Sequence, residues 1–368
     1  MAGSGRHHRR SKPKPARARD LGIPFDGTPG PLNAITDVAG VEVGHHTLIS
    51  GKSVRTGVTA LLPRGRSSAE PAFAAWFSQN GNGEMTGTAW IEESGVLDSP
   101  VMLTNTNSVG VVRDAVAAWE IERSVGRRLW VLPVVAETWD GWLNDINGFH
   151  VKGQHARAAL ERARPGPIAE GNVGGGTGMM GYEFKGGIGT SSRRLKRAHG
   201  GYTLGALVQL NCGLRPQLTI AGVSVGRHLT AERIMPSESG SIIIVIATDA
   251  PLIPTQLKRL ARRATMGLAR TGSVSGNGSG DIFIAFSTAP ISAPKKKSAS
   301  PRLIEVRMLR NEMIDPLFAA TVEATEEAII NALVAAQTMT GAGGRRLVAI
   351  PHEELKRTLE RYGRLPAG

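Results

Sequence analysis

A serine stands at the start of an unbroken β-branched run. Ser241 follows Gly240 at the end of a small polar segment, and residues 242–246 are all Ile or Val. Such a run is typical of a strand that is buried on both faces of a sheet. The hydroxyl of Ser241 is therefore expected at a strand end, where active sites are commonly built. The same pattern also fits an ordinary junction between a loop and a strand.

An acidic residue ends a second apolar run. We expect a buried strand over residues 129–136, and Glu137 follows it directly, with Trp139 two residues further on. A carboxylate in this position either caps the next turn or binds a cation. A further apolar strand, expected over residues 101–107, ends in amide and hydroxyl side chains, as the rim of an active site would.

A glycine-rich segment contains the spacing of a dinucleotide-binding fingerprint, G-x-G-x-x-G, at Gly176, Gly178 and Gly181. That fingerprint needs a strand before it and a helix after it. Here a proline-rich stretch precedes the glycines, and the residues after them do not favour a helix. We therefore predict that the backbone of this segment packs closely against its neighbours near a site, and that the segment does not bind a nucleotide.

Neither a metal nor another cofactor is expected. His45 and His46 are adjacent, but no third ligand follows at a spacing typical of a metal site. The single cysteine, Cys212, excludes an internal disulfide framework and is expected to be a small buried hydrophobe.

The elements that must position these residues alternate between strands and helices. Strands are expected over 55–63, 203–211, 217–225, 241–248 and 281–286, a helical turn over 72–78, and helices after Ser108 and over 154–164, 252–270, 316–338 and 353–361. The blocks of strands and helices, with hairpin-like strand pairs, favour a layered α/β architecture over a Rossmann repeat.

Composition indicates a globular protein. The chain has 368 residues, of which 41% are hydrophobic and 46 are glycine. No stretch approaches the roughly 20 apolar residues of a membrane span, and the first residues have no apolar core of a secretory signal. We therefore expect a cytoplasmic protein without a membrane partner.

The net charge of +13 is unevenly distributed. Residues 1–20 carry +6, and Lys295, Lys296, Lys297 and Arg302 add four positive charges, which leaves about +3 for the rest. We expect 1–20 to be a disordered basic tail. No aromatic residues interleave with it, so nucleic acid is expected to make no more than weak contacts with the tail.

Taken together, these segments resemble the L-aminopeptidase/D-esterase family, which includes the β-peptidyl aminopeptidases and is similar to N-terminal-nucleophile hydrolases. The resemblance covers residues 20–350 and is carried by segments 33–38, 80–87, 90–95, 103–110, 171–178, 209–211, 240–241 and 277–281. The basic tail and the insertion around Lys295 lie outside it.

The resemblance implies an inactive precursor that cuts itself at Gly240-Ser241. An α chain, residues 21–240 after the tail, and a β chain, residues 241–368, would remain together in one catalytic domain. The implied fold is a layered α/β structure, an αββα sandwich similar to that of N-terminal-nucleophile hydrolases but with its own topology. The implied assembly is a homo-oligomer, a tetramer in the family.

The resemblance also assigns roles to individual residues. Ser241 is the implied nucleophile, Ser279 and Asp281 are its supporting serine and carboxylate, Asn211 stabilises the oxyanion, and Glu137 binds the substrate amino group. Once Ser241 is N-terminal, its α-amine has a reference pKa of about 7.7 to 8.0 and can act as the base. Gly240 has no β-carbon and permits the strained backbone that self-attack requires.

Two positions depart from the family pattern. Where the family often has a tyrosine hydroxyl near the oxyanion, this chain has Trp139, whose indole N–H donates but does not exchange protons as a phenol does. Wall packing and an oxyanion role are both open for Trp139. Asp281 is one methylene shorter than the glutamate of the β-peptidyl branch, so the substrate range is expected to differ from that branch.

The expected function is a serine aminopeptidase or amidase that releases N-terminal residues from short peptides, amides or esters through an acyl-enzyme. A hydrolase of non-peptide oligoamides and an acyltransferase are alternatives on the same scaffold. A nucleic-acid-associated factor that acts through the tail is an alternative of another class. Neither the side chain nor the stereochemistry of the substrate follows from the sequence.

Overall fold

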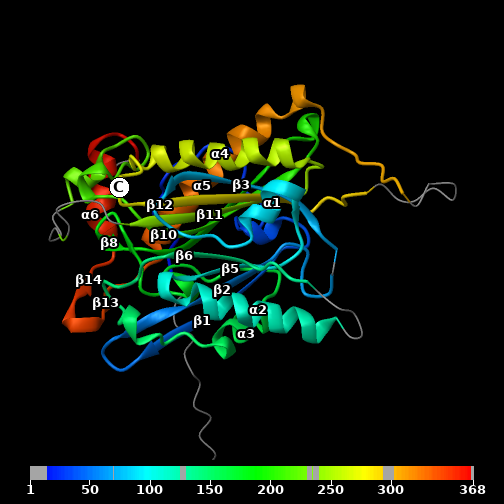
Figure 1. The fold of residues 1–368 in the computed structure, drawn as a ribbon. Coiled ribbons are helices and arrows are strands. Elements are labelled where there is room, and N and C mark those ends of the chain that lie inside the picture. Colours follow the sequence, from blue (N-terminus) through cyan, green and yellow to red (C-terminus); the bar gives the residue numbers. More distant parts are fainter. Residues whose placement is uncertain are drawn as a thin grey trace, which may run out of the picture.

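The computed structural model describes residues 15–68, 70–124, 130–229, 234, 240–292 and 302–365. Two sheets are stacked in the middle of the molecule, and helices cover the outer face of each (Figure 1). One sheet has the order β1-β2-β5-β6, and the other has the order β4-β3-β12-β11-β10-β9. The αββα sandwich expected from the sequence is thus confirmed.

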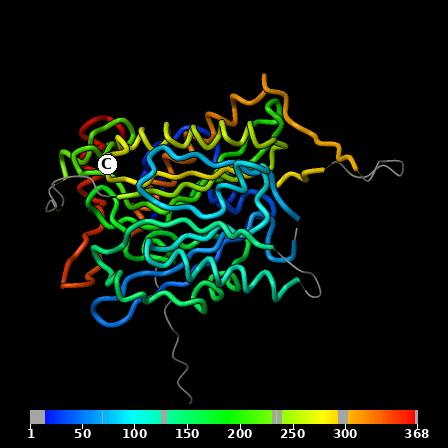
Figure 2. The backbone as a smooth tube through the Cα atoms, in the orientation of Figure 1, coloured from blue at the N-terminus to red at the C-terminus, as the bar shows by residue number. Residues whose placement is uncertain are grey.

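The larger sheet contains the strands that carry most of the candidate site residues. Its strands are β3 (Ala72–Gly81), β4 (Val96–Leu97), β9 (Gly187–Arg194), β10 (Thr203–Asn211), β11 (Ser241–Thr248) and β12 (Gly280–Ser287). The smaller sheet consists of β1 (Glu42–Ser50), β2 (Val54–Leu62), β5 (Val101–Asn105) and β6 (Val134–Thr138). Figure 2 traces both sheets, with yellow β11 and β12 in the upper one and blue β1 and β2 in the lower one.

Three layers of apolar side chains hold the sandwich together. Between the sheets, Ile243 and Val245 of β11 pack with Leu61 and Leu103. The opposite face of β11 packs against α4 (Pro254–Arg270) and α5 (Asp315–Val334). The predicted strand is thus buried on both faces because alternate residues of the Ile/Val run enter two different cores. The smaller sheet packs against α2 (Val109–Arg123) and α3 (Gly153–Glu161).

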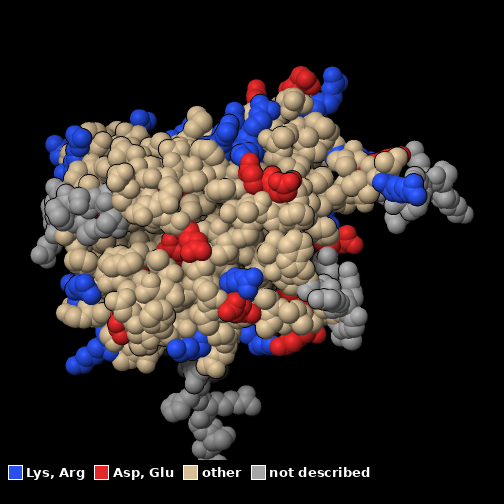
Figure 3. Space-filling view, in the orientation of Figure 1, with Lys and Arg blue, Asp and Glu red and all other residues tan. Residues whose placement is uncertain are grey.

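Shorter elements complete the fold. They are α1 (Thr88–Ser94), α6 (His352–Arg361) and the two-residue strands β7 (Met180–Gly181), β8 (Phe184–Lys185), β13 (Met339–Thr340) and β14 (Arg346–Leu347). Within the described residues, no helix combines the length and apolar character needed to cross a bilayer. Basic and acidic residues are interspersed on the face drawn in Figure 3.

Two local predictions were wrong. Residues 72–78 form part of strand β3, because pairing with β12 and burial between neighbouring layers outweigh the helix propensity of their alanines. Residues 217–225 form turns instead of a strand. Ala221 and Gly222 have φ values of 50° and 76°, which reverse the chain and let Ile220 pair with Val223.

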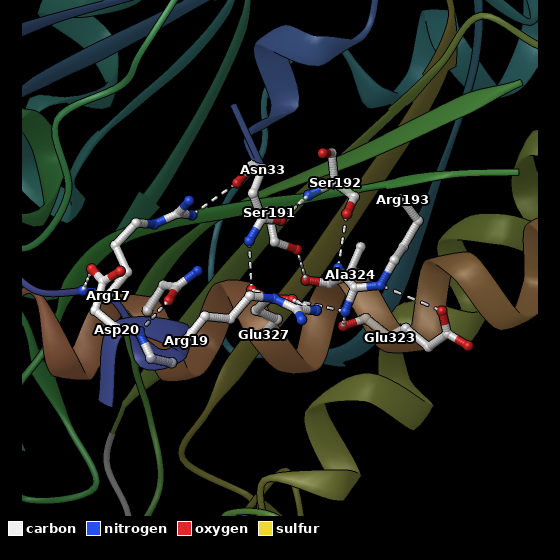
Figure 4. Close-up of polar contacts among 12 residues, drawn as sticks. Arg17, Arg19, Asp20, Asn33, Ser191, Ser192, Arg193, Glu323, Ala324 and Glu327 are labelled. Carbon is white, nitrogen blue, oxygen red and sulfur yellow. Dashed lines mark hydrogen bonds and ion pairs between the residues drawn. The ribbon is translucent and has the colours of Figure 1, made fainter. Parts of the chain in front are cut away.

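The prediction that the whole of residues 1–20 is disordered was wrong. Residues 1–14 lie outside the described part, but Ala18–Leu21 form a short helix that packs on α5. Arg19 and Glu327 face each other (Figure 4), and Arg19 Nε lies 2.8 Å from an oxygen of Glu327. The amide of Ala18 donates to the side chain of Asn331. Arg17 and Arg19 therefore belong to the folded body, because buried acceptors neutralise them.

Candidate active site

Ser241 lies between two strands that approach it from opposite sides. It is the first residue of β11, and only 5% of its surface is exposed. Across the antiparallel pair it faces Asn211, the last residue of β10. Across the parallel pair it faces Gly280, the first residue of β12. The three strand ends therefore bring together residues that are up to 69 positions apart, as the sequence predicted for Asn211 and Ser241.

The backbone amide of Gly280 contacts both the Ser241 hydroxyl and the Gly240 carbonyl group, whose carbon the hydroxyl would attack in self-cleavage. It donates to Ser241 Oγ at 3.1 Å and to the carbonyl oxygen of Gly240 at 3.2 Å. One donor thus holds the hydroxyl and the preceding carbonyl next to each other. A β-carbon at Gly240 would come within 2.0 Å of the carbonyl oxygen of Asn211, so this approach requires glycine.

Ser279 and Asp281 lie on either side of Gly280. Ser279 Oγ donates to Asp281 Oδ1 at 2.6 Å, and both side chains are buried. Burial raises the pKa of Asp281, an effect that the hydrogen bonds from Ser279, Ser275 and the amide of Ile242 partly oppose. Because Asp281 pairs in register with Ile242, its carboxyl group lies one residue away from the position of a new amino terminus at Ser241.

The side-chain amide of Asn211 is held in one orientation. Its Oδ1 accepts a 2.7 Å hydrogen bond from the amide of Met180, and its Nδ2 donates to the carbonyl oxygen of Trp139 at 2.9 Å. An amide nitrogen carries two hydrogens, and the Trp139 carbonyl takes one of them. The other hydrogen can serve a developing oxyanion beside Ser241.

Glu137 lies in the last part of β6, and not after the strand as predicted. The strand runs over Val134–Thr138, whereas residues 130–133 of the predicted 129–136 are not in a strand and residue 129 lies outside the described part. The carboxylate is 3% exposed and accepts hydrogen bonds from the amide of Glu84 at 3.0 Å and from Thr106 Oγ1 at 2.5 Å. Burial raises its pKa, and these two hydrogen bonds partly offset the rise.

A glycine separates the Glu137 carboxylate from the nucleophile region. A β-carbon built on Gly83 would lie 3.2 Å from Glu137 Oε1 and also 3.2 Å from the α-carbon of Gly280. Only Gly83 therefore separates the Glu137 carboxylate from Gly280, the residue whose amide donates to Ser241. This spacing suits a substrate whose ammonium group and scissile carbonyl are close in the molecule.

Trp139 contributes its backbone to the site. Its carbonyl oxygen accepts the hydrogen bond from Asn211, whereas its indole ring lies over Gly141 and is 39% exposed. The contacts of the ring with Gly141 leave both wall packing and an oxyanion role open for Trp139. A role of the indole N–H in substrate binding stays a prediction.

The backbone of the glycine-rich segment packs closely against neighbouring strands, as predicted. A β-carbon at Gly175 would lie 2.0 Å from Gln209 Oε1, and one at Gly178 would lie 2.2 Å from the carbonyl oxygen of Arg55. Strands follow the segment, so the context of a dinucleotide fingerprint is absent from this described part of the chain.

Sequence reasoning missed a buried lysine that holds this segment. Lys185 Nζ donates to the carbonyl oxygens of Gly176, Met179 and Gly186 at 2.9 to 3.1 Å. Burial lowers the pKa of Lys185 to about 7, and the charge of nearby Asp140 acts in the opposite direction. Its sequence signal was weak: a single lysine between Phe184 and two glycines.

The fold and site together define a hydrolase with a serine at the start of a central strand of an αββα sandwich. The profile of peptidase family S58 matches residues 33–347. The chain therefore belongs to peptidase family S58, and it is an aminopeptidase.

Relatives and solved structures agree with this placement. The chain is 52% identical to the beta-peptidyl aminopeptidase BapA of Sphingosinicella microcystinivorans, over 95% of this chain and 93% of the relative. Its identity to BapA of Sphingosinicella xenopeptidilytica is 46%, over 94% and 91%.

Among solved structures, the Burkholderia sp. beta-aminopeptidase has a TM-score of 0.88 and 50% identity, over 95% of this chain and 99% of that one. The L-aminopeptidase D-Ala-esterase/amidase of Ochrobactrum anthropi, described as a new variant among the Ntn hydrolase fold, has a TM-score of 0.88 and 49% identity over the same shares.

Proposed function

We propose that the protein cuts itself at Gly240-Ser241 and then hydrolyses short amides, peptides or esters with a free amino terminus through an acyl-enzyme on Ser241. The observation that carries this proposal is the shared donor: the Gly280 amide contacts both Ser241 Oγ and the Gly240 carbonyl oxygen. A hydroxyl and a carbonyl held by one N–H lie within reach of each other for attack.

Self-cleavage begins with attack of the Ser241 hydroxyl oxygen on the carbonyl carbon of Gly240. The hydroxyl proton passes to the leaving nitrogen, so the peptide bond is replaced by an ester. Water then hydrolyses the ester, which leaves Gly240 as a carboxylate and Ser241 with a free hydroxyl and a free α-amine. The Gly280 amide stabilises the negative charge that forms on the carbonyl oxygen.

Turnover uses the groups that cleavage has released. The neutral α-amine of Ser241 takes the hydroxyl proton as the oxygen attacks the substrate carbonyl, and it returns the proton to the leaving amine. Asn211 donates to the oxyanion. Asp281, bonded to Ser279, orients the new amino terminus. Water completes the cycle by hydrolysing the acyl-enzyme.

Glu137 gives the enzyme its preference for a free amino terminus. An exopeptidase distinguishes an N-terminal residue by its ammonium group, and the buried carboxylate of Glu137 supplies the opposite charge. A charge-assisted hydrogen bond in such a site contributes about 1.5 to 3 kcal/mol. The two beta-peptidyl aminopeptidases among the relatives support extending the substrate range to N-terminal β-amino residues.

We expect free β-alanyl and L-alanyl p-nitroanilides to be hydrolysed roughly ten- to hundredfold faster than their N-acetylated forms. Glu137→Gln should remove most of this preference, because the uncharged amide lowers kcat/KM for the free amines alone. Glu92→Gln, on the exposed surface of α1, is the matched control. Equal hydrolysis of free and acetylated substrates by the wild type would contradict the aminopeptidase mechanism and indicate a general amidase.

We also propose that the protein forms a homo-oligomer. An extended segment before α5 projects from the body (Figure 1, orange) and has a run of exposed apolar side chains: Leu303, Ile304, Val306 and Met308. Such a patch marks an association surface. Light scattering should show an assembly for the wild type and a smaller mass for Ile304→Asp, but not for Ile49→Asp on β1. A monomeric wild type would contradict the proposal.

A further inference from the structure

Two backbone peptide groups hold the side chain of Asn211. One joins Met179 to Met180, and its N–H donates to Asn211 Oδ1 at 2.7 Å. The other joins Trp139 to Asp140, and its carbonyl oxygen accepts a hydrogen bond from Asn211 Nδ2 at 2.9 Å. Because a peptide group is planar and stiff, a bond to its far side also restrains the atom that contacts Asn211.

Lys185 binds the far side of the first peptide group. Its Nζ donates to the carbonyl oxygen of Met179 at 2.9 Å, and this oxygen lies in the same peptide plane as the Met180 N–H. The carbonyl oxygens of Gly176 and Gly186 accept hydrogen bonds from the same Nζ. Three acceptors thus match the three hydrogens of a fully buried ammonium group, which fixes it in place.

The charge of Lys185 also strengthens the bond to Asn211. Hydrogen bonds in a chain polarise one another, so an ammonium group at a carbonyl oxygen makes the N–H of the same peptide group a better donor. Here the chain runs from Lys185 Nζ through one peptide group to Asn211 Oδ1. Asn211 pairs in register with Ser241. Two hydrogen bonds therefore connect the ammonium group to the side chain proposed to bind the oxyanion.

Asp140 has the corresponding place at the second peptide group. Its buried carboxylate accepts hydrogen bonds from Asn105 Nδ2 at 3.1 Å and from Asn144 Nδ2 at 3.0 Å. Burial raises the pKa of Asp140 to about 6, and hydrogen bonds, including one from its own backbone N–H, oppose this rise. That N–H belongs to the peptide group whose carbonyl oxygen contacts Asn211. A negative charge at the N–H makes this oxygen a stronger acceptor.

The two charged groups belong to segments that touch. Thr138 Oγ1, one residue before Trp139, donates to Met179 Sδ at 2.9 Å, and both side chains are buried. The charge of Asp140 favours the ammonium form of Lys185, against the larger effect of burial. The three carbonyl oxygens around Nζ favour the same form. A positive and a negative group thus lie behind the two contacts of one amide.

We propose that Lys185 is a positioning residue for the oxyanion step and that Asp140 is its partner. Lys185 fixes and polarises the peptide group that donates to Asn211 Oδ1, and Asp140 does the same for the peptide group that accepts from Nδ2. Together they direct the remaining Nδ2 hydrogen toward the oxyanion beside Ser241. Both act through Asn211 and not on the substrate, so the inference rests on the proposed oxyanion role of Asn211.

The first test removes the ammonium group. Lys185→Met keeps the apolar stem of the side chain but leaves the Met179 carbonyl oxygen without its charged donor. On purified protein that has already been cut, kcat should fall roughly ten- to hundredfold, the effect of one lost charge-assisted hydrogen bond, with little change in KM. Asp140→Asn keeps the shape of the other side chain and should also lower kcat more than it changes KM.

The second test asks whether Lys185 acts through Asn211. In the Asn211→Ala background the amide to be positioned is absent, so Lys185→Met should cost no further activity. The double variant should then have the same kcat as Asn211→Ala alone. A lysine that only stabilises the fold would lower kcat by the same factor in both backgrounds. Asp140→Asn is measured in the same two backgrounds and gives the same readout if Lys185→Met does not fold.

A matched control separates positioning from the general loss of a buried cation. Arg193 is also buried, and it bonds to Glu327 of α5. Arg193→Met should lower thermal stability and leave kcat of the cut enzyme at moderate temperature unchanged.

Two results would overturn the proposal. Wild-type kcat in folded Lys185→Met or, if that variant does not fold, in Asp140→Asn would show that the buried charges do not position Asn211. An equal loss of kcat in the wild-type and Asn211→Ala backgrounds would assign them a general structural role. Failure of the oxyanion role itself is read separately, from a wild-type kcat in the single variant Asn211→Ala.

Discussion

Replacing Ser241 with alanine should leave one chain of 368 residues with almost no hydrolytic activity. In the proposed mechanism, the variant lacks the hydroxyl that attacks Gly240 in the precursor and the substrate carbonyl in the mature enzyme. Without cleavage it would also lack the α-amine that we propose as the base. Loss of a nucleophile lowers kcat by roughly 10⁴- to 10⁶-fold, and we expect an effect in this range.

Two controls make the Ser241→Ala result specific. Ser241→Cys retains a nucleophilic side chain of similar size and should still be cut, although at a different rate. Ser279→Ala should be cut more slowly, since it removes only the 2.6 Å hydrogen bond to Asp281. Cleavage of Ser241→Ala at Gly240 would assign the nucleophile to another residue.

Replacing Asn211 with alanine should lower kcat by roughly 10²- to 10³-fold with little change in KM. The reason is that, in the proposed mechanism, the amide hydrogen contacts an oxyanion that exists only during the reaction. Because the same substitution can slow maturation, kcat must be measured on protein that has already been cut.

Asn211→Asp is a second variant that tests the same role of Asn211. Aspartate keeps an oxygen that accepts from the Met180 amide, but it places a second oxygen where Nδ2 now faces the Trp139 carbonyl. We expect a loss at least as large as in Asn211→Ala. An unchanged kcat in both variants would move oxyanion stabilisation to backbone amides such as that of Gly280.

Much of the fold could be predicted because local pattern and tertiary environment agree. The Ile/Val run gave the bounds of β11, and the apolar stretch before Asn211 gave those of β10. The sequence failed where tertiary pairing decides the outcome. The alanines of β3 have no strand preference of their own, and only the neighbouring β12 makes this segment extended.

The groups of the candidate site likewise include some that could be recognised from the sequence and some that could not. Side chains with chemical character, such as Ser241, Asn211 and Glu137, were recognisable in the sequence, and the strand ends bring them together. Backbone donors and acceptors were not recognisable, because every residue has them. The amides of Gly280 and Met180 contact Ser241 and Asn211 only through long-range packing.

Intact mass measurement of the purified, active wild-type protein tests the central claim most directly. We expect two chains, one ending at Gly240 and the other beginning Ser241-Ile242, with N-terminal sequencing of the smaller chain reading Ser-Ile-Ile-Ile. A serine-reactive sulfonyl fluoride should add its mass to the smaller chain and abolish activity. An active enzyme that remains a single uncut chain of 368 residues would contradict the account.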